Sequence, residues 1–343
     1  MTHQEAIEVA RTTVGVAAED DRDYIVQPTR HAEQLEAKLP GLATLLRRSE
    51  VSGLAEEYER EDKEAGRNQT LFKTTASRAN WAVMLTACFS ALLLVVGTLA
   101  TLVPETSGKV LLVGLGVCGV LTGGLASMWL FRARQGGLLD AWMSARAAAE
   151  ALRTKYFEAV TNADPAEVSS EIPLSLLQFE YFRRYQFDVQ KKFYDQRGQD
   201  HRRDADRLLQ ISAVAAGLAS IGAGLAASLG LLGTAWVSIA VLGTLGTALS
   251  SFASTKEAIG QSRRNSESYA KARDGLALLA RRIDNVRSAA ADGEREPLRQ
   301  FVAVVHDLLS SEHRQWLAAA QTIQPALDAL DTALAKLNLK PPK

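Results

Sequence analysis

Hydrophobic and charged residues are segregated along the chain. Four stretches, 81–103, 110–131, 211–233 and 235–253, contain no Asp, Glu, Lys, Arg or His. Each is 19 to 23 residues long, which matches the ~20 residues that an α-helix needs to cross the ~30 Å hydrocarbon core of a bilayer. A helix of a soluble bundle would keep a charged face, which these stretches lack. The pattern therefore predicts four transmembrane helices.

The four predicted spans pair into two hairpins because their connections are short. Residues 104–109 join the first pair, and residues 233–234 join the second. These connections together carry one Lys and one Glu, whereas Lys and Arg flank the opposite ends of the spans. The positive-inside rule then places both connections outside and both termini in the cytoplasm. Trp81, Trp129 and Trp236 lie at predicted span ends, where aromatic anchors are typical.

The charged segments between the spans predict long helices. They are rich in Ala, Leu, Glu, Arg and Gln, and proline is absent over most of their length. Because strand patterns are almost absent, we predict an all-α polytopic membrane protein with four transmembrane helices in two hairpins, extended by long cytoplasmic helices. Residues 1–40 predict only a short helix followed by a loose segment. The longer helices are expected at 41–103, 110–162, 174–230, 235–290 and 296–337.

The order of polar helix, hairpin and polar helix occurs twice. The first span begins at 81 and the third at 211, which is an offset of 130 residues. Both modules enter and leave the membrane on the same side, so the repeat is parallel, unlike the inverted repeats of many secondary transporters. We predict an N-terminal segment (1–50), two modules of two spans each (51–162 and 174–320) and a C-terminal helical tail (321–343).

Composition excludes several classes of function. Lys plus Arg and Asp plus Glu both number 39, so the chain lacks the basic surplus that nucleic-acid binding needs. Cys88 and Cys118 lie inside apolar stretches, and the five histidines have no zinc-type spacing with them. The sequence also lacks phosphate-loop, nucleophile-elbow and metalloprotease motifs. We therefore expect no enzyme activity, no cofactor and no catalytic or metal-binding residue.

Small and weakly polar residues are the remaining candidates within the spans. The absence of intramembrane charge argues against proton-coupled transporters and voltage sensors. Small residues allow close helix packing in lipid, and they also suit a pore wall, so both interpretations stay open. Four spans leave little room for a lumen, so a pore requires a homo-oligomer. The candidates are Gly119, Thr122, Gly123, Ser127, Ser220, Gly224, Gly243, Thr244, Thr247 and Ser251.

Two polar segments carry a family resemblance. The stretch WMSARAAAEALRTKYFEAV follows the first hairpin, and FVAVVHDLLSSEHRQWL follows the second. With the helix–hairpin–helix layout, they resemble the SLATT family, two-span effector domains associated with SMODS nucleotidyltransferases and SLOG nucleotide sensors. We identify the chain as a tandem of two such modules. The resemblance selects six candidates on the cytoplasmic helices: Trp142, Arg146, Glu150, Arg153, Glu312 and Trp316.

The resemblance implies a pore-forming effector of prokaryotic anti-phage or conflict defence in the inner membrane. It further implies a nucleotide second messenger or a signalling partner as the trigger. The sequence shows no attached nucleotide-sensing domain, which leaves the trigger open. Two alternatives remain: a membrane-anchored helical scaffold without conductance, and a small-solute transporter, against which the uncharged spans and the parallel repeat both weigh.

Overall fold

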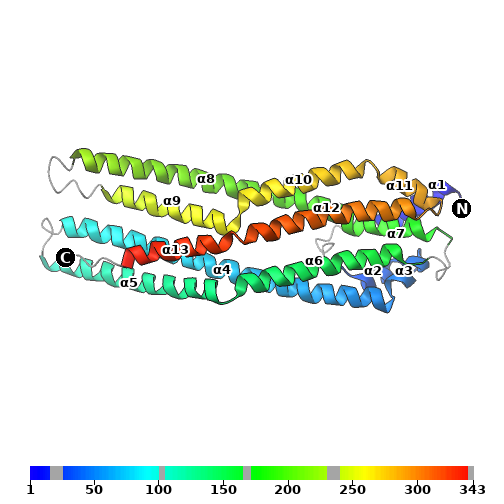
Figure 1. The fold of residues 1–343 in the computed structure, drawn as a ribbon, viewed down its shortest axis with the longest axis horizontal. Helices are drawn as coiled ribbons and strands as arrows, with labels where there is room; N and C mark the ends of the chain where they lie inside the picture. Colours follow the sequence, from blue (N-terminus) through cyan, green and yellow to red (C-terminus); the bar gives the residue numbers. More distant parts are fainter. Residues whose placement is uncertain (16–25, 100–104, 165–170, 230–239, 339–343) are drawn as a thin grey trace. The chain divides into compact units, whose positions relative to one another are not determined.

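The structure, a computed structural model, describes residues 1–15, 26–99, 105–164, 171–229 and 240–338. Every regular element in these ranges is helical, as predicted (Figure 1). The chain divides into two compact units that are interleaved along the sequence. Unit 1 contains Met1–Arg67, Ala141–Asp200 and Asn265–Leu317, and unit 2 contains Asn68–Asp140, His201–Arg264 and Ala318–Lys343. Both predicted modules therefore contribute residues to both units.

Unit 1 is built from short helices and from parts of long ones. Two helices, α4 (Ser49–Leu99) and α8 (Val189–Leu229), begin in unit 1 and continue into unit 2 without interruption. The other elements are α1 (His3–Gly15), α2 (Pro28–Leu35), α3 (Pro40–Leu46), α6 (Leu138–Asn162), α7 (Leu174–Phe182), a π-helix (Arg183–Asp188), α10 (Ser262–Ala280), α11 (Ile283–Ala291) and α12 (Glu296–Ala320).

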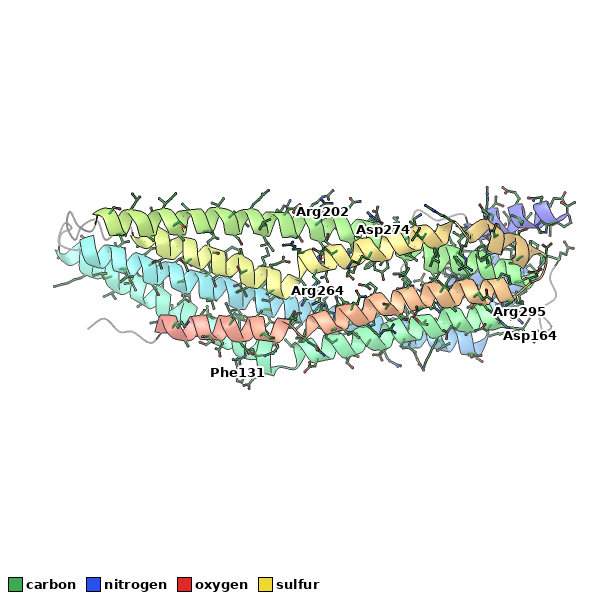
Figure 2. The ribbon with its side chains drawn as sticks, turned by 45° about the horizontal axis from the view of Figure 1, so that its top comes forward. Phe131, Asp164, Arg202, Arg264, Asp274 and Arg295 are labelled. Carbon is green, nitrogen blue, oxygen red and sulfur yellow. The ribbon has the colours of Figure 1, made fainter. Side chains whose placement is uncertain are left out.

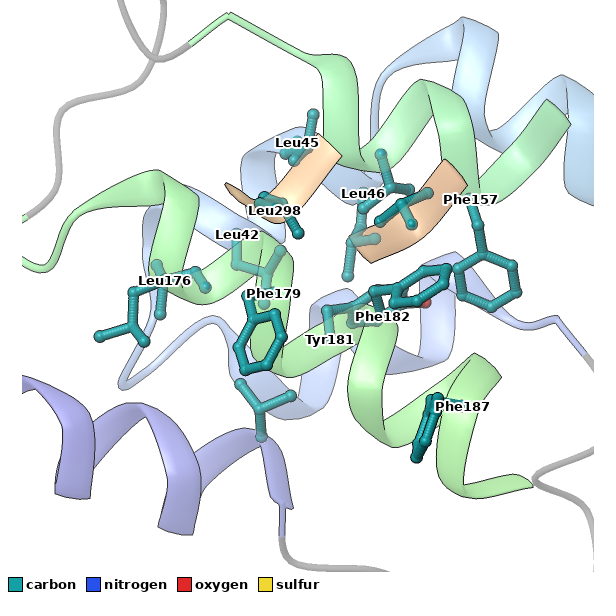
Figure 3. Close-up of a cluster of buried hydrophobic side chains, with 14 of the residues drawn as sticks. Leu42, Leu45, Leu46, Phe157, Leu176, Phe179, Tyr181, Phe182, Phe187 and Leu298 are labelled. Atoms are coloured by element: carbon teal, nitrogen blue, oxygen red, sulfur yellow. The ribbon is translucent and has the colours of Figure 1, made fainter. Parts of the chain in front are cut away.

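Aromatic side chains fill the core of unit 1 (Figure 3). Phe179 and Phe182 of α7 and Phe187 of the π-helix all contact the ring of Phe301 on α12, with centroids 5.6 to 6.3 Å apart. Helix α3 adds leucines that are fully buried in the same cluster, among them Leu42. Burial of large apolar side chains is the main stabilising contribution to folding. This core therefore gives unit 1 its own stability.

A buried hydrogen-bonded chain joins α2, α7 and α6. Nδ1 of His31 lies 2.8 Å from the Tyr181 hydroxyl, which lies 2.6 Å from the Tyr156 hydroxyl. The His31 ring also stacks on Tyr185, with centroids 4.0 Å apart. Burial lowers the pKa of His31 to about 3, with smaller effects from nearby arginines. The imidazole is therefore neutral at pH 7.

One buried carboxylate joins α7 to α11. Glu180 is fully buried and accepts hydrogen bonds from Nε of Arg183 at 2.7 Å and Nε of Arg287 at 2.6 Å. Each arginine also pairs with a carboxylate nearer the surface, Arg183 with Asp188 and Arg287 with Asp284. A buried charge is tolerated only when it is paired and hydrogen-bonded, and Glu180 meets this condition through two guanidinium groups.

Unit 2 contains the apolar parts of α4 and α8 together with α5 (Glu105–Gln135), α9 (Ala240–Gly260) and α13 (Ile323–Asn338). Nδ2 of Asn80 donates to the Phe252 carbonyl at 3.0 Å, and the Trp81 and Phe252 rings lie 4.6 Å apart, which joins α4 to α9. The Arg78 guanidinium lies 4.9 Å from the centre of the Trp129 ring. Two of the predicted aromatic anchors therefore also hold helices together.

Three helical stretches are long and apolar enough to cross a membrane: Ser49–Gly97, Thr106–Asn162 and Leu174–Ser228. They contain the described parts of the first three predicted spans. The fourth predicted span, 235–253, begins outside the described residues, as does its connection at 233–234, and α9 is described only from Ala240. The structure thus supports a helical protein with apolar, membrane-type helices, while the arrangement of four spans in two hairpins stays a prediction.

The apolar helices present large side chains outward. Phe131 of α5 is 63% exposed and projects away from the helix axis (Figure 2), and Val120 on the same helix is 76% exposed. Val214 and Ile221 of α8 are also exposed. Monomeric soluble proteins rarely expose apolar side chains in such continuous groups. These surfaces therefore fit contact with lipid or with another helix.

Four of the predicted helices are interrupted, at five places in all, so the prediction of unbroken helices was wrong for these four. Segment 41–103 divides between α3 and α4, 110–162 breaks at Gly136–Gly137, 235–290 breaks at Gln261 and again before α11, and 296–337 breaks between α12 and α13. The absence of proline permits a long helix but does not enforce one. Gly137 has φ 59° and Gln261 has φ 50°, so both leave the right-handed helical region.

Two further segments differ from expectation. Residues 26–40 form α2 and lead into α3, where a loose segment was predicted, because Pro28 and Pro40 each sit at a helix start, a position that proline favours. The acidic cluster at 18–21 lies outside the described residues. The described part of the predicted helix 174–230 is helical from Leu174 to Leu229, but it passes through the π-helix at Arg183–Asp188.

Candidate functional site

A network of charged and hydrogen-bonding side chains lies inside unit 1, and it contains all six residues that were predicted on the polar helices. Trp142, Arg146, Glu150 and Arg153 project from one face of α6, because residues three or four apart lie on the same side of a helix. Glu312 and Trp316 come from α12. The rest of this unit 1 network comes from α4, the π-helix, α8 and α10.

Arg146 is the centre of the network's ion pairs. Its Nη1 lies 3.0 Å from Oδ1 of Asp62 on α4, and its Nη2 lies 2.5 Å from Oε1 of Glu150. Nε of Arg153 donates to Oε1 of Gln186 in the π-helix at 2.9 Å. Burial by itself raises the pKa of Glu150, but the two guanidinium groups outweigh it and hold that pKa below its usual value. Arg146, Glu150 and Arg153 are therefore all charged at neutral pH.

Glu312 occupies a different environment. The Tyr194 hydroxyl on α8 donates to its Oε2 at 3.2 Å, and the Ser268 hydroxyl on α10 donates to its Oε1 at 3.4 Å. Burial is the largest effect and raises the pKa of Glu312 to about 7, with a further rise from Glu150 that the hydrogen bonds and Arg146 only partly offset. This carboxyl therefore exchanges its proton near neutral pH, unlike Glu150.

Aromatic rings adjoin the network. The Trp142 and Trp316 rings meet edge to face with centroids 5.4 Å apart, which joins α6 to α12. His313 stacks on Trp316 with centroids 5.8 Å apart, and burial lowers the pKa of His313. Within the described ranges, no three His, Cys, Asp or Glu side chains come together so as to hold a metal ion. The chemistry that this arrangement offers is a change of protonation at Glu312 that acts on several helices.

The small residues of unit 2 form a second feature, a close contact between α8 and α9. A Cβ atom at Gly246 would lie 2.5 Å from the backbone nitrogen of Ala219, and one at Gly222 would meet the backbone of Gly243. One at Gly243 would lie 3.4 Å from the backbone nitrogen of Ala223. Only glycine allows backbones to approach this closely in a helix pair. Of the predicted residues, Gly243 therefore belongs to this contact.

Thr122 joins α5 to α4. Its hydroxyl accepts a hydrogen bond from the Thr86 hydroxyl at 3.1 Å and donates to the Cys118 carbonyl at 2.8 Å. A Cβ atom at Gly119 would lie 3.8 Å from Cβ of Phe89, which is ordinary van der Waals contact. Both predicted residues thus lie where α5 meets α4.

The other predicted residues of the spans have local roles or outward positions. Ser127 donates to the Gly123 carbonyl at 3.1 Å, and Thr247 donates to the Gly243 carbonyl at 2.9 Å, so both hydroxyls bond within their own helix. Gly123 is buried, whereas Ser220 and Gly224 of α8 and Thr244 and Ser251 of α9 are exposed. None of these positions decides between helix packing and pore lining, so the pore-lining role stays a prediction.

Sequence reasoning did not single out several members of the two features. Tyr194, Ser268 and Gln186 were missed because hydroxyl and amide side chains on polar helices look like ordinary surface residues. Gly222 and Gly246 were missed as well, because no signal separated them from the other glycines of the apolar stretches. In a helix that is apolar all round, periodicity does not reveal the packing face.

The fold and these features define a class first: an all-helical protein with apolar helices of membrane type and a polar helical unit. Residues 182–316 match the sequence model of the SMODS and SLOG-associating 2TM effector domain 1, a SLATT family. The match begins at Phe182, includes α8 and α9, and ends at Trp316. The chain thus carries one region similar to this effector domain.

The match covers part of the unit 1 network. Gln186, Tyr194, Ser268 and Glu312 lie inside the matched residues, whereas α4 and α6 lie outside them. A second copy is not shown, so the tandem arrangement stays a prediction. No curated protein and no solved structure matches the chain.

Proposed function

We propose that the protein is a membrane effector that acts as a homo-oligomeric pore or ion channel and is controlled through unit 1. The similarity of residues 182–316 to an effector domain with two transmembrane helices supports the membrane role. The three apolar helical stretches support it independently. That family description names no enzyme activity, and the function proposed here requires none.

The observation that carries the proposal is a face of α8 made of small residues that the described part of the chain leaves exposed. Gly217, Ser220, Gly224 and Ser228 are spaced three or four apart and are all exposed. A Cβ atom at Gly217 or Gly224 would have no neighbour within 4 Å. At 100° per residue, Gly217 lies about 200° around the helix from Ala219, and Gly224 lies about 200° from Gly222. Ala219 and Gly222 belong to the contact with α9, so the face with Gly217 and Gly224 is opposite to that contact.

Such a face suits contact with another copy. Glycine in a helix costs about 1 kcal/mol relative to alanine, and contact with lipid chains does not offset this cost. Contact with a neighbouring helix offsets it, because small residues let two backbones approach closely. A pore also requires several copies, since α8 and α9 of one chain are in direct contact and leave no lumen between them.

The location and the trigger follow from the same proposal. The charge distribution around the apolar stretches favours both termini in the cytoplasm, and the similarity to the SLATT effector domain is the ground for placing the protein in the inner membrane of a prokaryote. Unit 1 would then be on the cytoplasmic side, where a nucleotide second messenger or a signalling partner can reach it. Loss of membrane integrity in an anti-phage or conflict response would be the outcome.

Planar-bilayer recording of the purified protein tests the proposal. We expect discrete current steps, and we expect cyclic oligonucleotides on the unit 1 side to change them if a nucleotide is the trigger. Gly217→Leu and Gly224→Leu should lower both the current and the oligomer mass in detergent. Leu218→Phe, at an exposed apolar position of the same helix about 100° away from Gly217, is the matched control and should change neither. A bilayer that stays silent with inserted protein would contradict the pore.

A membrane-anchored scaffold is the second candidate, and the independent core of unit 1 favours it. Replacing the apolar parts of unit 2 by generic Leu/Ala spans separates the two functions. A scaffold keeps its cellular effect after this change, whereas a pore loses it.

A further inference from the structure

One side chain joins two helix breaks in unit 2. Gln261 lies between α9 and α10, and its Nε2 donates to the Ala319 carbonyl at 2.6 Å and to the Thr322 hydroxyl at 2.9 Å. Ala319 is in the last turn of α12, and Thr322 lies between α12 and α13. The start of α13 is therefore fixed to the break in the neighbouring helix.

A second attachment comes from near a third break. Arg134 lies two residues before the break at Gly136–Gly137 that ends α5. Its Nη2 lies 2.8 Å from Oδ1 of Asp328 and its Nη1 lies 2.6 Å from Oδ2 of Asp331, both on α13. Charge-assisted hydrogen bonds of this kind are about twice as strong as neutral ones.

The adjoining face of α13 is apolar and covered. Leu327, Leu330 and Leu334 are at most 2% exposed, and the helix packs against both α5 and α9. Figure 1 shows α13 running alongside α5 in the opposite direction. Because α5 comes from the first predicted hairpin and α9 from the second, α13 joins helices from both.

The backbone at Gln261 has an alternative conformation. Its φ of 50° lies in the left-handed region, which disfavours residues other than glycine. Such a conformation persists only where the surroundings hold it in place. Without the bonds to Ala319 and Thr322, a right-handed Gln261 would continue α9 directly into α10. Loss of those bonds would therefore favour a continuous α9–α10 helix with α13 free over the broken form with α13 attached.

We propose that α13 is a releasable latch: Gln261 and Arg134 hold it on α5 and α9, and its release frees the helices of the two predicted hairpins to move. With the pore proposed above, on which this consequence rests, attached α13 is the closed state and released α13 the open one. Helix α12, which leads directly to the latch, is the element through which unit 1 would act on it.

Cysteine labelling in proteoliposomes tests the latch without relying on conductance. In a Cys88→Ser, Cys118→Ser background, Leu330→Cys reports release because this position is covered, whereas Thr332→Cys is exposed and serves as the matched control. Arg134→Ala and Gln261→Ala should each raise the maleimide labelling rate at position 330 by about tenfold, the factor expected when one strong polar contact is lost. The rate at position 332 should stay unchanged.

Further variants test whether faster labelling comes from the lost contacts of Arg134 and Gln261 and not from a general loosening of the fold. Arg134→Asp should raise the labelling rate, and adding Asp331→Arg should restore it, because the pair is re-formed with reversed charge. Gln261→Gly keeps the left-handed backbone but loses the side-chain bonds, so its effect should be smaller than that of Gln261→Ala. If Leu330→Cys does not fold, Leu334→Cys reports on the same buried face.

Dye leakage measured on the same vesicles separates the two proposals. Faster labelling together with more leakage supports a latch on a pore. Unchanged labelling at position 330 in every variant would show that α13 is a permanent part of unit 2, and the latch would be wrong. Faster labelling with no leakage from any sample would remove the pore and, with it, the gating role of α13.

Discussion

Replacing Glu312 by glutamine should stabilise unit 1 in a pH-dependent way. Glutamine has nearly the same shape and can still accept the hydrogen bond from Tyr194, but it removes the buried negative charge. Burial raises the pKa of Glu312 from 4.5 to about 7. A carboxyl whose pKa is raised by folding contributes stability that is fully present below the unfolded pKa and is lost as the pH rises through the folded pKa.

The size of the effect follows from that shift. A difference of about 2.5 pKa units corresponds to about 3 kcal/mol at 1.36 kcal/mol per unit. Glu312 is partly exposed, so solvent screening reduces the net gain from the substitution to about 1–3 kcal/mol. The advantage of Glu312→Gln should be near zero at pH 4.5, should grow through pH 6 to 7, and should be constant above pH 8.

Hydrogen exchange of the detergent-solubilised protein measures the stability gain from Glu312→Gln in the helices around the site. Amide protection in α10 and α12 reports the opening free energy of the helices that hold the site, without requiring reversible unfolding of the membrane part. The variant and the wild type are compared at the same pH, so that the intrinsic pH dependence of exchange cancels. Asp307→Asn, exposed in the middle of the same α12 helix, is the matched control and should give no difference at any pH.

The Glu312 reasoning has a clear point of failure. Protection that differs between the variant and the wild type by the same amount at pH 5 and pH 8 would show that Glu312 is not desolvated. Lower protection of the variant at pH 8 would show that the charged carboxylate is a net stabilising partner of Arg146. Either result would refute the proton-exchange role assigned to this residue.

Three further predictions concern packing and buried charge. Gly246→Val places a side chain against the Ala219 backbone and should destabilise the protein in detergent by about 1–3 kcal/mol. Gly217→Ala, with open space around it, should instead stabilise the protein by up to about 1 kcal/mol; denaturant titration compares the two. Glu180→Ala removes the buried carboxylate that Arg183 and Arg287 share and leaves each arginine with one surface partner; it should cost at most about 3–5 kcal/mol, measured as lost protection in α7 and α11. Because the folded pKa of His31 is lowered to about 3, wild-type stability should fall as the pH drops from 6.5 towards 3, and His31→Phe should flatten that slope in urea titrations at pH 4, 5 and 6.

The polar face of α6 shows how much of the unit 1 network can be predicted from the spacing of residues in the sequence. Trp142, Arg146, Glu150 and Arg153 recur at helical intervals, so the spacing by itself places them on one face of α6. Their partner Glu312 is more than 150 residues away in the sequence. Charged residues on polar helices are usually solvated, and nothing local indicates that Tyr194 and Ser268 close over this one.

The helix breaks show the opposite limit. Gly137 adopts a left-handed backbone conformation, which glycine can adopt at any position. The glycine pair at 136–137 therefore permitted a helix break there but did not require one. Gln261 gives no local signal, because its backbone conformation depends on bonds to Ala319 and Thr322, about 60 residues away. Local propensity favours a continuous helix there, and tertiary contacts override it.

The sequence by itself determined the class of this protein. Uncharged stretches of membrane length and polar segments of strong helix formers permit an all-helical membrane protein, because backbone hydrogen bonds must be satisfied internally in lipid. The tertiary structure decided which glycines face a neighbouring helix, where the long helices break, which carboxyl loses its solvent, and that the C-terminal helix packs on α5 and α9. These properties depend on contacts between residues far apart in the chain, and an apolar or polar pattern read along one helix does not contain them.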